Sequence, residues 1–119
     1  MADYKEWELV FYEDEAGRSP AREFLQSLDA KTLTRFVWSI EQLRIHNVRA
    51  HEPLVRHLEG KLWELREESN TNIYRLLYFF FSGRQIVLLH GFQKKTQKTP
   101  SREIDIALQR LDHYIKRNR

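Results

Sequence analysis

The chain of 119 residues contains no cysteine, only four glycines and only three prolines. Without cysteine it can form neither a disulfide nor a thiolate metal site, and nothing points to an oxidising compartment. The low glycine and proline content excludes collagen-like and low-complexity classes. The composition is that of an ordinary globular protein, for which we expect a cytoplasmic location.

Long hydrophobic runs are also lacking. The longest apolar run, Leu76 to Phe81, is far shorter than the roughly 20 residues of a membrane helix. The acidic N-terminus has no signal-peptide pattern, so we expect neither membrane insertion nor secretion. A hydrophobic fraction of 41% suffices for a core, and the length predicts a single domain over residues 1–119.

Positive charge is unevenly distributed along the chain. Residues 1–53 carry 7 basic and 10 acidic side chains, whereas residues 54–119 carry 13 and 7. Residues 84–102 contain no acidic residue and five basic ones, Arg84, Lys94, Lys95, Lys98 and Arg102. This asymmetry indicates a basic face for a polyanion such as RNA; the alternative is that the net charge of +3 serves only solubility.

The N-terminal half predicts one strand followed by two helices. Residues 6–12 alternate apolar and polar side chains with the period of a half-buried strand. Ser19 and Pro20 are typical of a helix start, and Asp29 can cap a second helix. The apolar stripe of that second helix consists of Leu33, Phe36, Val37, Ile40 and Leu43.

The C-terminal half predicts an antiparallel meander and a last helix. Residues 54–58 and 62–66 flank Gly60, whose freedom to adopt positive φ suits a tight hairpin. We expect a turn over residues 67–72, a central strand over 73–81, a turn at Ser82 and Gly83, and a strand over 85–92. Thr99 and Pro100 open the final helix.

Helices and strands are thus segregated along the chain, without parallel βαβ repeats. This order predicts an α+β fold in which a small antiparallel-rich sheet of about four to five strands is packed by two N-terminal helices and one C-terminal helix.

Three segments carry a resemblance to a known family. They are Leu62-Trp63-Glu64-Leu65-Arg66, Ile73-Tyr74-Arg75-Leu76-Leu77-Tyr78 and, most specifically, Val87 to Pro100 leading into a helix. With these segments the chain resembles the RelE/ParE superfamily of toxin–antitoxin toxins, and within it the HigB-like branch that includes phage-derived relatives.

The resemblance implies a RelE-like fold and a small mRNA-cleaving endoribonuclease, an mRNA interferase that usually acts in the ribosome and inhibits translation. It further implies a helix-turn-helix antitoxin as partner. By the same resemblance the catalytic cations fall on Arg66, Arg75, Lys94 and Lys95.

The chemistry of RNA cleavage fits such residues. When the 2′-hydroxyl attacks the adjacent phosphate, the reaction needs a base, charge stabilisation and an acid, but no metal. Neighbouring cations favour loss of a lysine's proton, so Lys94 and Lys95 are candidates for base or acid. Arg66 and Arg75 would clamp phosphate oxygens if both face one groove; alternatively, they are strand residues paired with Glu64, Glu67 or Glu68.

Further basic residues are expected to bind the RNA backbone or ribosome: Arg56, His57, Lys61, Lys98 and Arg102. His90 alternates with apolar residues, which favours a hydrogen-bonded, partly buried histidine over a proton carrier. His46, His51 and His57 lack the spacing of a metal site, so we expect no metal or other cofactor.

A second hypothesis from another class is a non-catalytic toxin or adaptor, such as a gyrase-targeting, ParE-like protein. A pure inhibitor would not need Arg66, Arg75 and Lys94 together.

Overall fold

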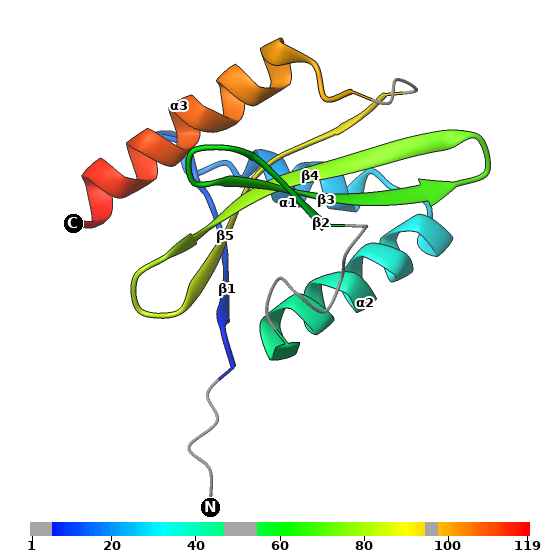
Figure 1. The fold of residues 1–119 in the computed structure, drawn as a ribbon, viewed down its shortest axis with the longest axis horizontal. Coiled ribbons are helices and arrows are strands. Elements are labelled where there is room, and N and C mark those ends of the chain that lie inside the picture. The colour runs from blue at the N-terminus through cyan, green and yellow to red at the C-terminus, as the bar shows by residue number, and fades with distance from the viewer. Residues whose placement is uncertain (1–5, 47–54, 95–97) are drawn as a thin grey trace, which may run out of the picture.

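A computed structural model describes residues 6–46, 55–94 and 98–119 (Figure 1). Its elements are β1 (Glu8–Phe11), α1 (Pro20–Gln26), α2 (Ala30–His46), β2 (Val55–Glu59), β3 (Leu62–Ser69), β4 (Asn72–Phe81), β5 (Gln85–Gln93) and α3 (Ser101–Asn118). The strands form one sheet in the order β1-β5-β4-β3-β2. The predicted α+β architecture, including the RelE-like arrangement of helices, is confirmed.

The sheet is antiparallel except at one edge. Strands β2 to β5 pair with their neighbours in chain order, whereas β1 runs parallel to β5 with Glu8 opposite Gln85. β4 lies at the centre, as its continuous apolar sequence predicted.

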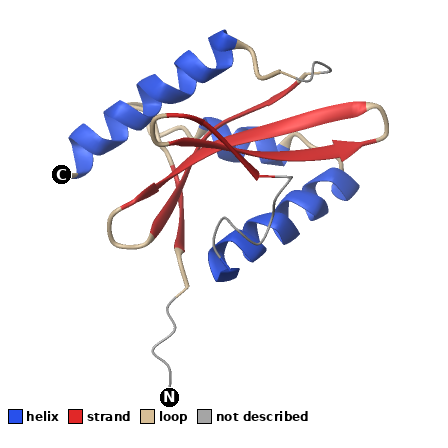
Figure 2. Ribbon diagram, viewed as in Figure 1, coloured by secondary structure: helices blue, strands red, loops and turns tan. Residues whose placement is uncertain are grey.

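The two faces of the sheet carry two separate cores (Figure 2). Because strand side chains alternate, Leu76 and Tyr78 of β4 pack with α1 and α2, whereas Leu77 and Phe79 pack with α3. We call these the α1/α2 face and the α3 face. None of the helices in the described ranges is both long and apolar enough to cross a membrane.

The first two helices begin where the sequence predicted. The Ser19 hydroxyl accepts a hydrogen bond from the Arg22 N–H at 3.3 Å, and a carboxylate oxygen of Asp29 accepts one from the Thr32 N–H at 2.8 Å. Val37 departs from the prediction because its side chain is exposed rather than part of the buried stripe.

The β3–β4 connection is shorter than predicted. β3 continues through Ser69, so the turn consists of Asn70 and Thr71 rather than residues 67–72. Asn70 has φ of 58°, a left-handed conformation that asparagine tolerates better than most residues. Consequently Glu67 is a strand residue on the α1/α2 face. The hairpin at Gly60, with φ of 56°, is confirmed.

Gly91 permits α1 to lie against β5. A Cβ atom at this position would come within 2.1 Å of the Phe24 ring. The glycine is therefore required by a close approach on the α1/α2 face rather than by its backbone angle.

Candidate nucleic-acid interface

Arg66 and Arg75 are direct partners across β3 and β4. Both project from the α3 face, because Arg75 alternates with Leu77 and Phe79 of that core. The expectation that they share one face is met, although the turn between them differs from the predicted one. Two like charges in register are unfavourable unless an anion lies nearby.

Arg75 is fully buried, whereas Arg66 is partly exposed. The Arg75 Nη1 donates to the backbone oxygen of Lys98 at 3.3 Å, and its Nε lies 3.5 Å from a carboxylate oxygen of Glu64. Burial lowers the pKa of Arg75, Glu64 opposes this, and the charges of Arg66 and Arg56 lower it further. The alternative in which an arginine pairs with Glu64 thus holds for Arg75.

Glu64 is the anion that this group of arginines surrounds. Its side chain is only 3% exposed, and it accepts a hydrogen bond from the Thr99 hydroxyl. Its second oxygen lies 3.9 Å from Arg56 Nη2, on the neighbouring strand β2. Sequence reasoning named Glu64 only as a possible partner of the arginines. The available signal was that Glu64 lies two residues after Leu62, and therefore on the same face of the strand as this buried apolar residue.

The basic residues after β5 approach the same end of the sheet. The Lys94 N–H donates to the backbone oxygen of Ile73 at 3.0 Å. The backbone oxygen of Lys98 accepts a hydrogen bond from the side chain of Arg75, which lies two residues after Ile73 on β4. Both lysine side chains are exposed, as is Arg102 in the first turn of α3. Lys95 and His51 lie outside the described residues. Arg56 thus lies beside Glu64, Arg66 lies opposite Arg75, and the backbones of Lys94 and Lys98 are bonded to β4 near Arg75. Together with Arg102, which follows Lys98 by four residues, we call this set of cations the basic face.

Two predicted binding residues lie elsewhere. His57 is on the opposite face of the sheet from Arg56, where its ring packs on Trp63 at 5.1 Å and its Nε2 lies 2.7 Å from the Gly60 oxygen. Lys61 sits in the exposed β2–β3 turn, which is about 17 Å from Arg66 at the rise of a strand. Neither residue contributes to the basic face in this arrangement.

His90 has the partly buried, hydrogen-bonded position that its alternation predicted. Arg110 Nη1 donates to His90 Nδ1 at 2.9 Å, which leaves the proton on Nε2, 2.6 Å from Glu103. Burial lowers the pKa of His90 although Glu103 opposes it. The contacts join β5 to α3, and burial favours the neutral form of the histidine.

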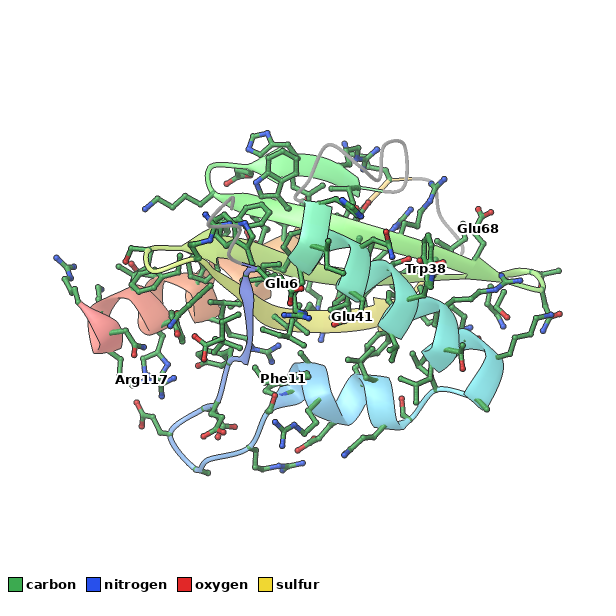
Figure 3. All side chains as sticks on the ribbon, turned by 90° about the horizontal axis from the view of Figure 1, so that it is seen from below. Glu6, Phe11, Trp38, Glu41, Glu68 and Arg117 are labelled. Carbon is green, nitrogen blue, oxygen red and sulfur yellow. The ribbon has the colours of Figure 1, made fainter. Side chains whose placement is uncertain are left out.

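A second polar feature lies on the α1/α2 face, where sequence reasoning predicted none. Thr34, Arg35, Trp38, Ser39 and Glu67 line an open hollow between α2 and β3. Figure 3 labels Trp38, which α2 carries, and Arg35 of the same helix donates a hydrogen bond to the backbone oxygen of Glu68. Within the described ranges no group of three or more His, Asp or Glu side chains could hold a metal ion on either face.

A protein-family model matches the part of the chain that carries the basic face. The family model for "Phage derived protein Gp49-like (DUF891)" matches residues 23–112, well over half of the sequence. The chain belongs to the Gp49-like family. This family is associated with RelE-like toxins, and the match spans β2 to β5 and most of α3, including every described residue of the basic face. No protein of curated function matches this Gp49-like chain.

Proposed function

We propose that this Gp49-like protein is the toxin of a type II toxin–antitoxin system, of the HigB-like branch, and that it cleaves mRNA on the ribosome without a metal. The observation that carries the proposal is the basic face: Arg66, Lys94 and Lys98 converge at one sheet end within the family-matched region. Membership of a family associated with RelE-like toxins supports it.

The cations other than Arg75 have different roles in the proposed reaction. Arg66 binds the scissile phosphate, because a guanidinium stays charged and donates two parallel hydrogen bonds. Lys94 and Lys95 transfer protons to and from the 2′- and 5′-oxygens, which are the base and acid roles that this reaction requires. Arg56, Lys98 and Arg102 bind neighbouring phosphates of the RNA.

Arg75 has a different part. Its side chain is fully buried and already joined to Glu64 and Lys98, so it acts on the reaction by holding those residues and by adding positive potential beneath the phosphate. His57 and Lys61 contact the ribosome rather than the scissile phosphate, because they lie away from the basic face.

The proposed partners are mRNA, the ribosome and a helix-turn-helix antitoxin in the cytoplasm. The antitoxin silences the toxin by covering the basic face or by keeping it from the ribosome. Purification of the tagged protein from cells that express it with any small helix-turn-helix gene found beside its own tests this; failure to recover such a complex would count against it.

Primer extension on an mRNA in a translating extract tests the activity, with EDTA-treated and untreated naked RNA as controls. We expect discrete cuts only during translation and none in either naked-RNA control. Treating the protein with a chelator beforehand should not reduce the cutting. Arg66→Ala and Lys94→Ala/Lys95→Ala should each reduce cutting by about 100-fold or more.

Lys116→Ala is the matched control. It removes one positive charge near the opposite end of α3, about 21 Å along the helix from Arg102 of the basic face, and should cut like the wild type. Intact mRNA with pure, folded protein would favour the non-catalytic, gyrase-targeting alternative, for which DNA supercoiling by gyrase is the assay.

A further inference from the structure

We propose that Glu64 is a positioning residue for the basic face: through Thr99 and Arg75 it fixes Lys98 beside Lys94 and Arg66. The inference rests on the proposed function and assigns a role within it to an acidic residue, in a site where only cations were expected.

Two hydrogen bonds attach the chain before α3 to the sheet. The Thr99 hydroxyl donates to Glu64 on β3, and the adjacent Lys98 oxygen accepts from Arg75 on β4. On the other side, the Lys94 N–H is bonded to Ile73, two residues from Arg75 on the same strand. Lys94 and Lys98 are therefore both held on a short stretch of β4.

The orientation of Thr99 is informative because a threonine beside a helix start commonly caps the helix. Here Pro100 is the N-cap residue of α3, and no side chain caps it. Thr99 is instead 2% exposed, with its hydroxyl turned to Glu64. A cap that could stabilise α3 is thus replaced by a contact that locates Lys98.

The pairing of Glu64 with Arg75 also determines which arginine can bind substrate. Glu64 forms an ion pair with Arg75 inside the protein. Arg66, which lies opposite Arg75 in the strand register, is partly exposed. A buried ion pair contributes little net stability compared with apolar packing, but it demands a defined geometry. That combination fits a residue whose main effect is to place other groups.

The test compares Thr99→Val with Thr99→Ser. Valine has the shape of threonine but lacks the hydroxyl, whereas serine keeps the bond to Glu64. We expect Thr99→Val to lower the rate of mRNA cutting at saturating ribosome concentration by about tenfold or more, and Thr99→Ser to remain within about twofold of the wild type. The unfolding midpoint of each variant shows whether the fold is retained.

A spectroscopic measurement tests the contacts among Thr99, Glu64 and Arg75 without an assay of mRNA cutting. The side-chain Nε–H resonance of Arg75 should be sharp in NMR spectra of the wild type and of Thr99→Ser, and broadened in Thr99→Val and in Glu64→Gln. Equal cutting by the two Thr99 variants, or an unchanged Arg75 resonance in Thr99→Val, would overturn the proposal.

The two proposals fail differently. If the wild type cuts no mRNA, the proposed nuclease function is overturned and the positioning role in that reaction falls with it, while the Arg75 resonance still decides whether Thr99 and Glu64 hold the segment. If the wild type cuts and both Thr99 variants cut equally, only the positioning role is lost.

Discussion

Glu64 and Glu67 are two buried carboxylates of one strand with opposite surroundings. They lie three residues apart on β3 and are 3% and 7% exposed. Glu64, on the α3 face, is shared by Arg75, Arg56 and Thr99. Glu67, on the α1/α2 face, accepts a hydrogen bond from Ser39, and burial raises its pKa despite that bond and the charge of Arg35. The partners of a buried carboxylate, rather than its burial, decide its role.

The largest expected effect comes from neutralising Glu64. In Glu64→Gln the buried Arg75 loses its counter-charge, and we expect the free energy of unfolding to fall by about 3 kcal/mol. Urea unfolding at neutral pH measures this loss.

Glu68→Gln is the control for that change. Glu68 is on the same strand and the same face as Glu64 but is exposed, so its variant should stay within about 0.5 kcal/mol of the wild type. Equal effects of the two substitutions would show that the pairing of Glu64 with Arg75 contributes nothing.

Gly91→Ala tests the apolar packing of α1 on the α1/α2 face, which is the face that carries Glu67. The new methyl group would overlap the Phe24 ring, so we expect a loss of about 2 kcal/mol in the free energy of unfolding. Phe24→Leu in the same background should recover part of that loss by making room. Purely additive effects in this double-mutant cycle would contradict the close contact.

Strand and helix patterns were sufficient to predict most of the fold. The alternation in residues 6–12, the caps at Ser19 and Asp29 and the glycine turn at 60 are local signals, and the structure contains each of these elements. The parallel pairing of β1 with β5 was not predicted, because it depends on which sheet edge remains open after the meander has formed. Similarly, the helical period placed Val37 in the apolar stripe, but which edge of a stripe is covered depends on how the helix packs on the sheet, and Val37 is exposed.

The candidate site was predictable only in part. The cations were visible as a charge pattern, and strand register then brought Arg66 opposite Arg75. That Arg75 would be buried and Arg66 partly exposed could not be predicted from the sequence, since it depends on the burial of Glu64 and on the segment before α3 covering Arg75. The role of Thr99 was also hidden, because the same threonine could equally have capped α3.

Tyr78→Phe should change the free energy of unfolding by less than Glu64→Gln or Gly91→Ala does, and should raise it rather than lower it. The Tyr78 hydroxyl is buried on the α1/α2 face without a hydrogen-bond partner in the described structure, and burial raises its pKa. Removing it should raise the free energy of unfolding by about 1 kcal/mol.

Tyr114→Phe provides the contrast on the α3 face. Its hydroxyl donates to Gln85 at 2.7 Å, so its removal should lower the free energy of unfolding by about 1 kcal/mol. Two changes of the same sign in urea unfolding would argue against the difference between the faces.

Glu67→Gln should give the smallest effect, below about 1 kcal/mol, and one that depends on pH. Because the folded-state pKa of Glu67 is raised, the native state binds its proton more tightly than the unfolded chain does, and ionising it lowers stability as pH rises through that range. The variant should therefore be more stable than the wild type near pH 7, with the difference vanishing below about pH 4. A difference that is constant with pH would show that Glu67 ionises as in the unfolded chain.

The parallel edge strand has a kinetic consequence. Glu8 of β1 pairs with Gln85 of β5, the last strand in chain order, so β1 has no partner until all the other strands have been synthesised. Closing so long a loop is entropically expensive and favours late formation. The Trp7 ring, whose centroid lies 5.0 Å from that of Phe80 beside β1, should therefore be among the last side chains to become ordered, and the sheet should be complete only after β5 has been synthesised.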